Sequence, residues 1–292
     1  MVARVQSSRR RRGSLAVPLC RASRSGRVAP EIPPQPLRLH VMPLRDTEAF
    51  VLRSYTLKEA DKICVFLTRD AGKIRGVAHG ARKLKSKYGA SLEPFTEVSL
   101  HYFEQENREL VSINNCEIIR SQFSDVISSE RLAALHYLSE LLLEFLPDHE
   151  PNETVYRLVG AALKALKQMP ADDPSLLLRY CEVWILKLAG FFPDWKHCAE
   201  CQRELPMNAP AWLSSDSAPL CSNCANQRGE TQPAETRMLV NDILRQSPEK
   251  FVTLSRDPRV LMKLESIITK LIKNALEREL KSYEMLGRLK PV

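Results

Sequence analysis

The hydrophobic pattern of the chain changes its period once, near residue 124, and this change limits the folds open to it. Between residues 46 and 120, apolar residues alternate with polar ones, as at Val98, Leu100 and Tyr102. Alternation of this kind is typical of half-buried strands. After residue 124, apolar residues recur every three or four positions, which is typical of amphipathic helices. The sequence therefore predicts an α+β multidomain protein, with a β domain over 42–124 and an all-α domain over 125–292.

Five strand patterns lie in the first of these regions, over residues 47–53, 62–68, 73–79, 95–103 and 110–119. The sequence Asp70-Ala71-Gly72 predicts a tight turn between the second and third strands, and a longer connection separates the third from the fourth. Five short strands of this kind favour a small closed barrel, and we expect the OB-fold.

The helical region contains a first apolar stripe from Leu132 to Phe145, preceded by the N-cap candidates Ser128 and Ser129. Further helices are expected over residues 153–168, 175–189, 234–246 and 259–285. A loop-rich element at about 194–230 interrupts this domain.

The interrupting element contains two Cys-x2-Cys pairs separated by nineteen residues: Cys198, Cys201, Cys221 and Cys224. Two pairs at this spacing predict a tetrahedral Zn²⁺ site with four thiolate ligands. Disulfides are the alternative, and they are disfavoured because the chain is long and has no secretion signal. The other four cysteines are isolated: Cys20, Cys64, Cys116 and Cys181. The last three lie in strand or helix patterns, where buried apolar positions are expected.

Four cysteines would close the coordination sphere of the metal, whereas a hydrolytic zinc keeps one position open. The element has three basic and five acidic residues over 194–230, a poor composition for contacting DNA. We therefore expect a structural metal that folds a short segment, and no enzymatic activity.

The formal net charge of +8 is unevenly distributed. Residues 1–45 contain ten arginines and one acid, residues 53–87 contain ten cations and three acids, and residues 88–262 contain 16 basic and 25 acidic residues. A compact basic segment on an acidic body is typical of a phosphate-binding module. A solvated charged face is the alternative.

The densest cations lie in the segment Gly80-Ala81-Arg82-Lys83-Leu84-Lys85-Ser86-Lys87-Tyr88-Gly89, which follows the third strand. Such a loop on an OB-fold predicts a site for single-stranded nucleic acid, with aromatic side chains that stack on bases. Tyr88, Tyr55 and Phe66 are the stacking candidates, and core packing is the alternative for each. Lys73 and Arg75 are expected on one face of the third strand. The predicted contacts are Lys73, Arg75, Arg82, Lys83, Lys85, Lys87 and Tyr88. The chain has no phosphate-binding G-x4-G-K-[ST] motif, so we do not expect ATP hydrolysis.

The first 41 residues are rich in Arg, Ser and Pro and are expected to be a disordered basic extension. Patterned sequence begins directly after Met42, which favours Met42 as the true start; an organelle transit peptide is the alternative. The longest stretches without a charge have 11 residues, against the ~20 that a membrane-spanning helix needs.

Several segments together resemble the bacterial RecO family: Phe66-Leu67-Thr68-Arg69-Asp70-Ala71-Gly72-Lys73-Ile74, Gly80-Ala81-Arg82-Lys83 with Lys85-Ser86, Leu92-Glu93-Pro94-Phe95, and Gly190-Phe191-Phe192-Pro193 ahead of the cysteine pairs. The resemblance extends from about Met42 to the C-terminus. It implies an N-terminal OB domain, a helical domain and a zinc element. One departure is that Gln202 and Ala225 stand where such knuckles often have glycine.

The resemblance also implies a function, that of a cytoplasmic, nucleoid-associated recombination mediator. Such a protein binds single- and double-stranded DNA, anneals complementary strands and, with RecR, loads RecA onto DNA coated by single-stranded-DNA-binding protein. The acidic C-terminal tail of the coating protein would need a groove rimmed by cations, for which Lys263, Lys270 and Lys273 are candidates beside the alternative of a solvated face. The other functional alternatives are a zinc-containing OB-fold RNA-binding factor in translation or transcription and, least favoured, a zinc hydrolase.

Overall fold

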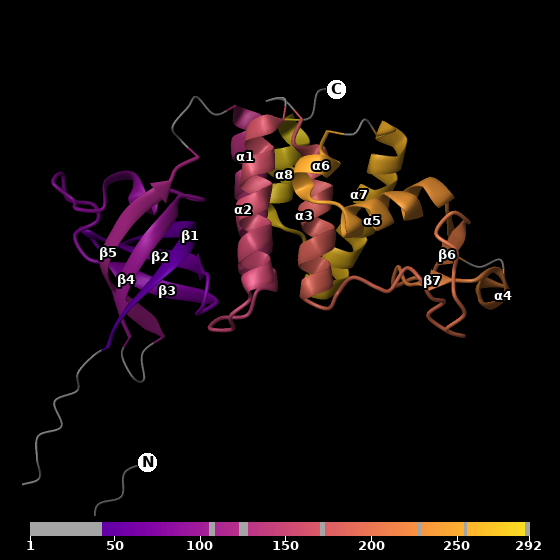
Figure 1. Ribbon diagram of the computed structural model, residues 1–292, viewed down its shortest axis with the longest axis horizontal. Helices are drawn as coiled ribbons and strands as arrows, with labels where there is room; N and C mark the ends of the chain where they lie inside the picture. The colour runs from indigo at the N-terminus through magenta and orange to yellow at the C-terminus, as the bar shows by residue number, and fades with distance from the viewer. Residues whose placement is uncertain are drawn as a thin grey trace, which may run out of the picture. The chain divides into compact units, whose positions relative to one another are not determined.

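The structure is a computed structural model that describes residues 43–104, 109–122, 128–169, 173–226, 229–253 and 256–289. The predicted extension over 1–41, its Cys20 and the expected start at Met42 lie outside these ranges. Figure 1 follows the chain from the barrel strands through the helices, with a small sheet between α3 and α5.

Five strands form a closed barrel in the order β1-β2-β3-β5-β4, and the predicted OB-like architecture is confirmed. Neighbouring strands are antiparallel except for β3 and β5, which run parallel. The strands are β1 (Leu44–Leu57), β2 (Asp61–Thr68), β3 (Lys73–Ala78), β4 (Glu97–Phe103) and β5 (Leu110–Arg120), with a 3₁₀ turn, η1 (Gly89–Leu92), between β3 and β4.

Strand β1 closes the barrel because it is long enough to pair with two neighbours. Its residues 44–50 pair with β4, its residues 49–57 pair with β2, and the register shifts between Val51 and Arg53. A shift of this kind bends a strand, which a small barrel requires. Alternation then gives β1 two buried faces: Ala49 and Val51 lie in the barrel core, whereas Phe50 and Leu52 belong to the core of the helices.

The barrel and the helices are joined by close backbone contacts as well as by this shared core. Gly72 has a φ of 71°, and a Cβ at this position would lie 2.2 Å from the carbonyl oxygen of Glu150. Only glycine satisfies both the conformation and the close approach. The hydroxyl of Ser139 donates to the carbonyl of Leu52 at 2.7 Å.

The helices are α1 (Ser129–Phe145), α2 (Glu153–Gln168), α3 (Ser175–Leu188), α4 (Ser222–Ala225), α5 (Ala234–Arg245), α6 (Pro248–Phe251), α7 (Pro258–Leu276) and α8 (Lys281–Leu289). Side chains of Ser128, Asn152 and Asp257 cap α1, α2 and α7 by accepting backbone N–H groups. The helices expected at 153–168, 175–189 and 234–246 are confirmed to within a residue at each end.

The expectation of one helix over residues 259–285 is wrong. Helix α7 ends at Leu276, and Glu277 takes a left-handed conformation with a φ of 55°. Helix α8 then packs against α1. The Glu140 carboxylate accepts the backbone amides of Lys281 and Ser282 at 3.0 and 2.7 Å, so a residue of α1 caps the start of α8.

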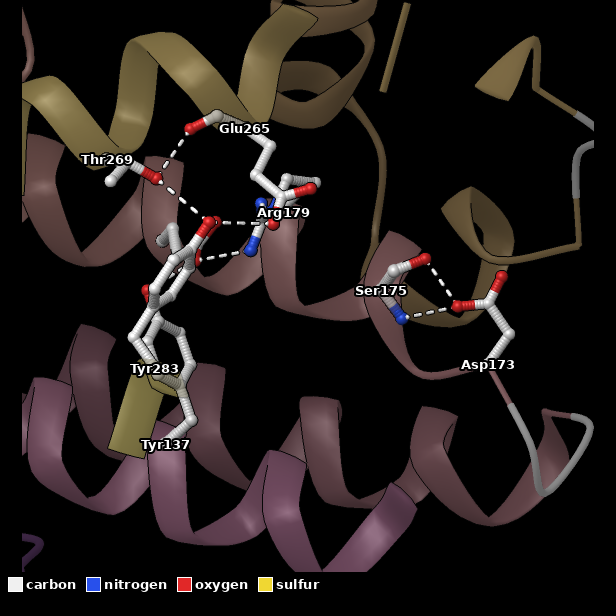
Figure 2. A network of polar contacts seen from close by, with 8 residues as sticks. Tyr137, Asp173, Ser175, Arg179, Glu265, Thr269 and Tyr283 are labelled. Atoms are coloured by element: carbon white, nitrogen blue, oxygen red, sulfur yellow. Dashed lines mark hydrogen bonds and ion pairs between the residues drawn. The ribbon is translucent and has the colours of Figure 1, made fainter. Parts of the chain in front are cut away.

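A buried polar network joins four helices of the domain (Figure 2). Arg179 of α3 pairs with Glu182 at 2.6 Å and with Glu265 of α7 at 3.3 Å. Tyr137 of α1 donates to Glu182 at 2.6 Å, and Tyr283 of α8 donates to Glu265 at 3.0 Å. Because an ion in the interior must be paired, this network fixes how the helices pack.

Candidate nucleic-acid interface and metal centre

The segment 80–89, called the basic loop below, is held at its beginning by the turn between β1 and β2. The amide of Gly80 donates to the Asp61 carboxylate at 2.8 Å, and this hydrogen bond is the main cause that lowers the pKa of Asp61. The Arg82 amide and guanidinium donate to carbonyl oxygens of residues 58–60 at 2.9 to 3.1 Å. Arg82 is therefore both an exposed cation and a brace for the loop.

The end of the basic loop is held by β5. The hydroxyl of Tyr88 donates to the carbonyl of Ile113 at 2.9 Å, and burial raises the pKa of Tyr88 to about 12. The ammonium of Lys87 donates to the carbonyl of Asn114 and lies 5.2 Å from the centre of the Tyr88 ring. Tyr88 is only 4 % exposed, so its ring packs in the barrel core and positions the loop, and this position does not fit the predicted stacking on bases.

The tip of the basic loop presents two exposed cations, Lys83 and Lys85. Two consecutive turns form it, closed by the amide of Lys83 to the carbonyl of Gly80 and by the amide of Ser86 to the carbonyl of Lys83, at 3.1 and 3.0 Å. Lys83, Leu84 and Lys85 are all exposed. Within the described part of the chain, neither lysine side chain forms a hydrogen bond or an ion pair. Both side chains are therefore available to a phosphate.

Lys73 and Arg75 share one face of β3 as expected, and both reach Asp148. Lys73 is 5 % exposed, and its ammonium lies 3.1 Å from the Asp148 carboxylate and 2.7 Å from the carbonyl of Leu143. Lys73 therefore joins the barrel to α1, and its buried position does not fit the predicted contact with DNA. Arg75 is exposed and lies 3.2 Å from Asp148, which neutralises part of its charge.

The other two stacking candidates, Phe66 and Tyr55, differ in their exposure to solvent. Phe66 is fully buried in the barrel core, as its alternative interpretation stated. Tyr55 is 45 % exposed, and the guanidinium of Arg53 lies 5.4 Å from the centre of its ring. Tyr55 is therefore the predicted aromatic side chain that can stack on a base.

The four predicted cysteine ligands meet at one point. Their sulfur atoms all lie within 4.8 Å of one another, and those of Cys201 and Cys221 are 3.8 Å apart. Tetrahedral coordination with metal–sulfur bonds of about 2.3 Å would place ligand sulfurs about 3.8 Å apart. The cluster can therefore hold one metal ion. Cys64, Cys116 and Cys181 are buried apart from it, as expected.

Backbone amides donate to the sulfur atoms of Cys198 and Cys221 and lower the pKa of both thiols. The amide of Cys221 points to the sulfur of Cys198 at 3.4 Å. Burial alone would raise the pKa of Cys198, but amide donors from residues 200, 201 and 221 outweigh it and lower the pKa to about 6. The turns form without glycine: Gln202 has a φ of 58°, and Asn226, after Ala225, has a φ of 44°. The departure at Gln202 and Ala225 thus leaves the ligand geometry intact.

The cysteine-containing element has little apolar core of its own. It contains a three-stranded sheet of β6 (Ala211–Leu213), β7 (Pro219–Leu220) and β8 (Glu230–Gln232) in the order β7-β6-β8. Its buried apolar cluster is Cys198, Leu205, Ala211, Leu220, Cys221 and Ala225. Two of the predicted ligands are members of this small cluster, so a metal bound there would add cross-links to a segment with little core.

Arg237 of α5 attaches this element to the helical domain, and the sequence analysis missed it. Arg237 is 1 % exposed, and its guanidinium donates to the carbonyls of Trp195 and Leu205 at 2.8 and 3.0 Å. It also donates to the carbonyls of Pro206 and Ala209. Burial lowers the pKa of Arg237. The available signal was its spacing, because residue 237 lies three positions before the buried Val240 on one face of α5.

The lysines of α7 considered for an acidic tail already have acidic partners. Lys263 and Lys270 both pair with Glu230, and Lys273 pairs with Glu279 at 2.8 Å. Among the described residues, no helix combines the length and apolar content needed to cross a membrane.

Comparison with known proteins places these features in a family. The model "Recombination protein O N terminal" matches residues 42–122, and "Recombination protein O C terminal" matches residues 128–284. The chain belongs to the RecO family. Its curated relatives include DNA repair protein RecO of Koribacter versatilis, with 32 % identity over 84 % of this chain and 99 % of the relative. DNA repair protein RecO of Geobacter metallireducens is 28 % identical over 84 % of this chain and 98 % of the relative. That of Thermoanaerobacter sp. is 26 % identical over 85 % of this chain and 99 % of the relative.

Membership of the RecO family indicates a role in DNA repair and recombination. It also explains the division of the chain, because the N-terminal match covers the barrel and the C-terminal match covers the helices and the cysteine cluster. The two matches leave a gap around the undescribed residues 123–127, where the predicted boundary between 124 and 125 also lies.

Proposed function

We propose that this RecO-family chain is a non-enzymatic recombination mediator that binds single- and double-stranded DNA through the basic loop. The observation that carries the proposal is the braced loop tip, where Lys83 and Lys85 have no partners among the described residues. Arg82 and Lys87 are exposed cations of the same loop, Arg75 is an exposed cation of β3, and Tyr55 offers a ring for stacking. Cations on a rigid loop of an OB-like barrel suit the sugar–phosphate backbone.

The physical basis of binding is the release of counterions from phosphates, so affinity falls steeply as salt rises. Annealing follows from the same charges. Two complementary strands repel each other, and a cationic surface that holds both lowers this repulsion. The excess of acidic residues over 88–262 disfavours DNA contact in that part of the chain.

The proposed partners are those that the resemblance to RecO implies. In this proposal the chain joins RecR and loads RecA onto DNA coated by single-stranded-DNA-binding protein, in the bacterial cytoplasm at the nucleoid. The lysines of α7 have acidic partners, so an acidic tail would have to displace Glu230 or Glu279 to bind there.

An annealing assay tests the proposed function. Complementary strands are first coated with single-stranded-DNA-binding protein, and duplex formation is followed with and without this chain. Acceleration is expected with the wild-type chain and is lost with Lys83→Glu/Lys85→Glu. An equal rate in all three reactions contradicts the proposal. Competition between DNA and RNA strands of one sequence tests the RNA-binding alternative. Tighter binding of the RNA strand would favour that alternative.

The metal of the cysteine cluster is Zn²⁺ in this proposal, with a structural role. Four thiolates suit zinc and leave no position for a substrate or a reactive water. Metal analysis of the purified chain is expected to give one zinc per chain, and Cys198→Ser is expected to lose it. Trypsin should then cleave within residues 194–230 while DNA affinity is retained. Intact metal in the variant, or unchanged resistance to trypsin, contradicts this assignment.

A further inference from the structure

The tip of the basic loop contains an apolar side chain that phosphate binding does not use. Leu84 is fully exposed, and it stands between Lys83 and Lys85, which have no partners among the described residues. Burial of this side chain on binding would remove apolar surface from water, which is favourable. Its position is specific, because no other exposed large apolar residue in the described ranges lies between two such cations.

The loop cannot readily fold back to cover Leu84. The two turns that end at Lys83 and Ser86 fix the backbone on both sides of it. The Arg82 guanidinium and the Tyr88 hydroxyl hold the ends of the loop against the barrel. Leu84 is therefore held out from the surface at the apex of a braced loop.

We infer that Leu84 is a wedge that inserts between adjacent bases of bound DNA while Lys83 and Lys85 contact the phosphates on either side. The inference rests on the proposed DNA-binding function and adds a second kind of contact to it. Leucine is one of the apolar side chains that proteins insert between base steps, where burial of the side chain offsets part of the lost stacking. Two flanking cations favour such insertion because they hold the backbone next to the wedge.

The wedge would also contribute to annealing. Bases of a single strand stack on one another, and pairing with a second strand requires their edges to be presented in the correct order. A strand opened at one step and held by its phosphates presents unstacked bases to its complement. Leu84 is thus a positioning residue: affinity comes mainly from the lysines, and the local conformation of the strand comes from the leucine.

The probe for this inference is a single-stranded 30-mer with one 2-aminopurine between adenines, because emission of 2-aminopurine rises when it unstacks. Emission is measured at saturating wild-type chain, with Leu84→Ser and with Leu84→Met. The control is Leu44→Ser, because Leu44 is an exposed leucine of the same barrel outside the basic loop. Affinity and its salt dependence are measured on the same oligonucleotide by fluorescence anisotropy.

The expected result is a rise in emission with wild type, Leu84→Met and Leu44→Ser, and emission near that of free oligonucleotide with Leu84→Ser. Affinity of Leu84→Ser should fall by less than about tenfold with an unchanged salt slope, because the phosphate contacts remain. Equal emission for Leu84→Ser and wild type overturns the wedge and leaves the proposed function standing. Absence of binding by the wild-type chain overturns both.

Discussion

The buried arginines of the helical domain and the lysines of the basic loop are charged alike but lie in opposite surroundings. Arg179 and Arg237 are almost fully buried, and each is surrounded by carboxylate or carbonyl oxygens of the chain itself. Lys83 and Lys85 are exposed and have no such oxygen among the described residues. The first pair contributes to the fold, and the second is available to an external anion. The charge of a segment therefore indicates a binding site only when its partners are known.

The largest expected effect concerns the buried set. Arg179→Met leaves the carboxylates of Glu182 and Glu265 without their cation, so the free energy of unfolding is expected to fall by about 3–5 kcal/mol. Urea denaturation followed by circular dichroism measures it. The control is Arg259→Met, which removes an exposed pair with Asp257 and should change stability little. Equal stability of the two variants would remove the distinction between buried and exposed cations.

The next effect concerns the exposed set. Lys83→Glu/Lys85→Glu is expected to weaken binding of a single-stranded oligonucleotide by more than about tenfold, because two phosphate contacts become repulsive. Stability and metal content should not change. The matched control is Lys270→Glu/Lys273→Glu, with the same change of net charge on α7. Similar losses in both variants would show that net charge matters and that the loop does not.

A smaller effect separates free cations from partly neutralised ones. Lys85→Gln is expected to reduce the slope of log affinity against log salt by about one unit, as loss of one phosphate contact does. Arg75→Gln should reduce it less, because Asp148 already pairs with Arg75. Anisotropy titrations between low and moderate salt measure both slopes. A larger reduction for Arg75→Gln would reverse the proposed order.

The smallest expected effect concerns Glu140, the carboxylate of α1 that caps α8. Burial raises its pKa, but hydrogen bonds from Ser282 and the amide of Lys281 outweigh burial, and the pKa is lowered in the folded chain. A folded-state pKa below the unfolded one stabilises the fold at neutral pH, and this contribution is lost as the pH falls through the folded pKa. Docking of α8 should therefore weaken in acid. Hydrogen exchange of the α8 amides from pH 7 downward measures it, and Glu140→Gln should flatten the dependence. An equally steep dependence in the variant would assign it to other groups.

Local pattern was sufficient for much of the fold. The five strands, the first three helices and the four cysteine ligands were predicted because each depends on residues close in the sequence: alternation, N-caps and Cys-x2-Cys spacing. The helix expected over 259–285 was wrong because its apolar stripe continues through the break at Glu277. The start of α8 after this break is capped by Glu140, which is 141 residues away from Lys281.

The candidate interface was predictable as a segment, but the role of each residue in it was not. Lys73 and Tyr88 lie in the predicted strand and loop, yet contacts with Leu143 and Ile113 bury them. Arg237 was missed because its carbonyl partners lie about 30 residues away in an irregular segment. Burial and partners of this kind depend on the three-dimensional packing of distant segments, which periodicity does not report.

Chemical modification of lysines, read by mass spectrometry, tests the central claim most directly. The chain is acetylated briefly with and without a saturating single-stranded oligonucleotide, and modification is compared at each lysine. Lys83 and Lys85 should react readily in the free chain and become protected by DNA, whereas Lys270 and Lys273 should react equally in both samples. Protection on α7 with no change at Lys83 and Lys85 would contradict the account.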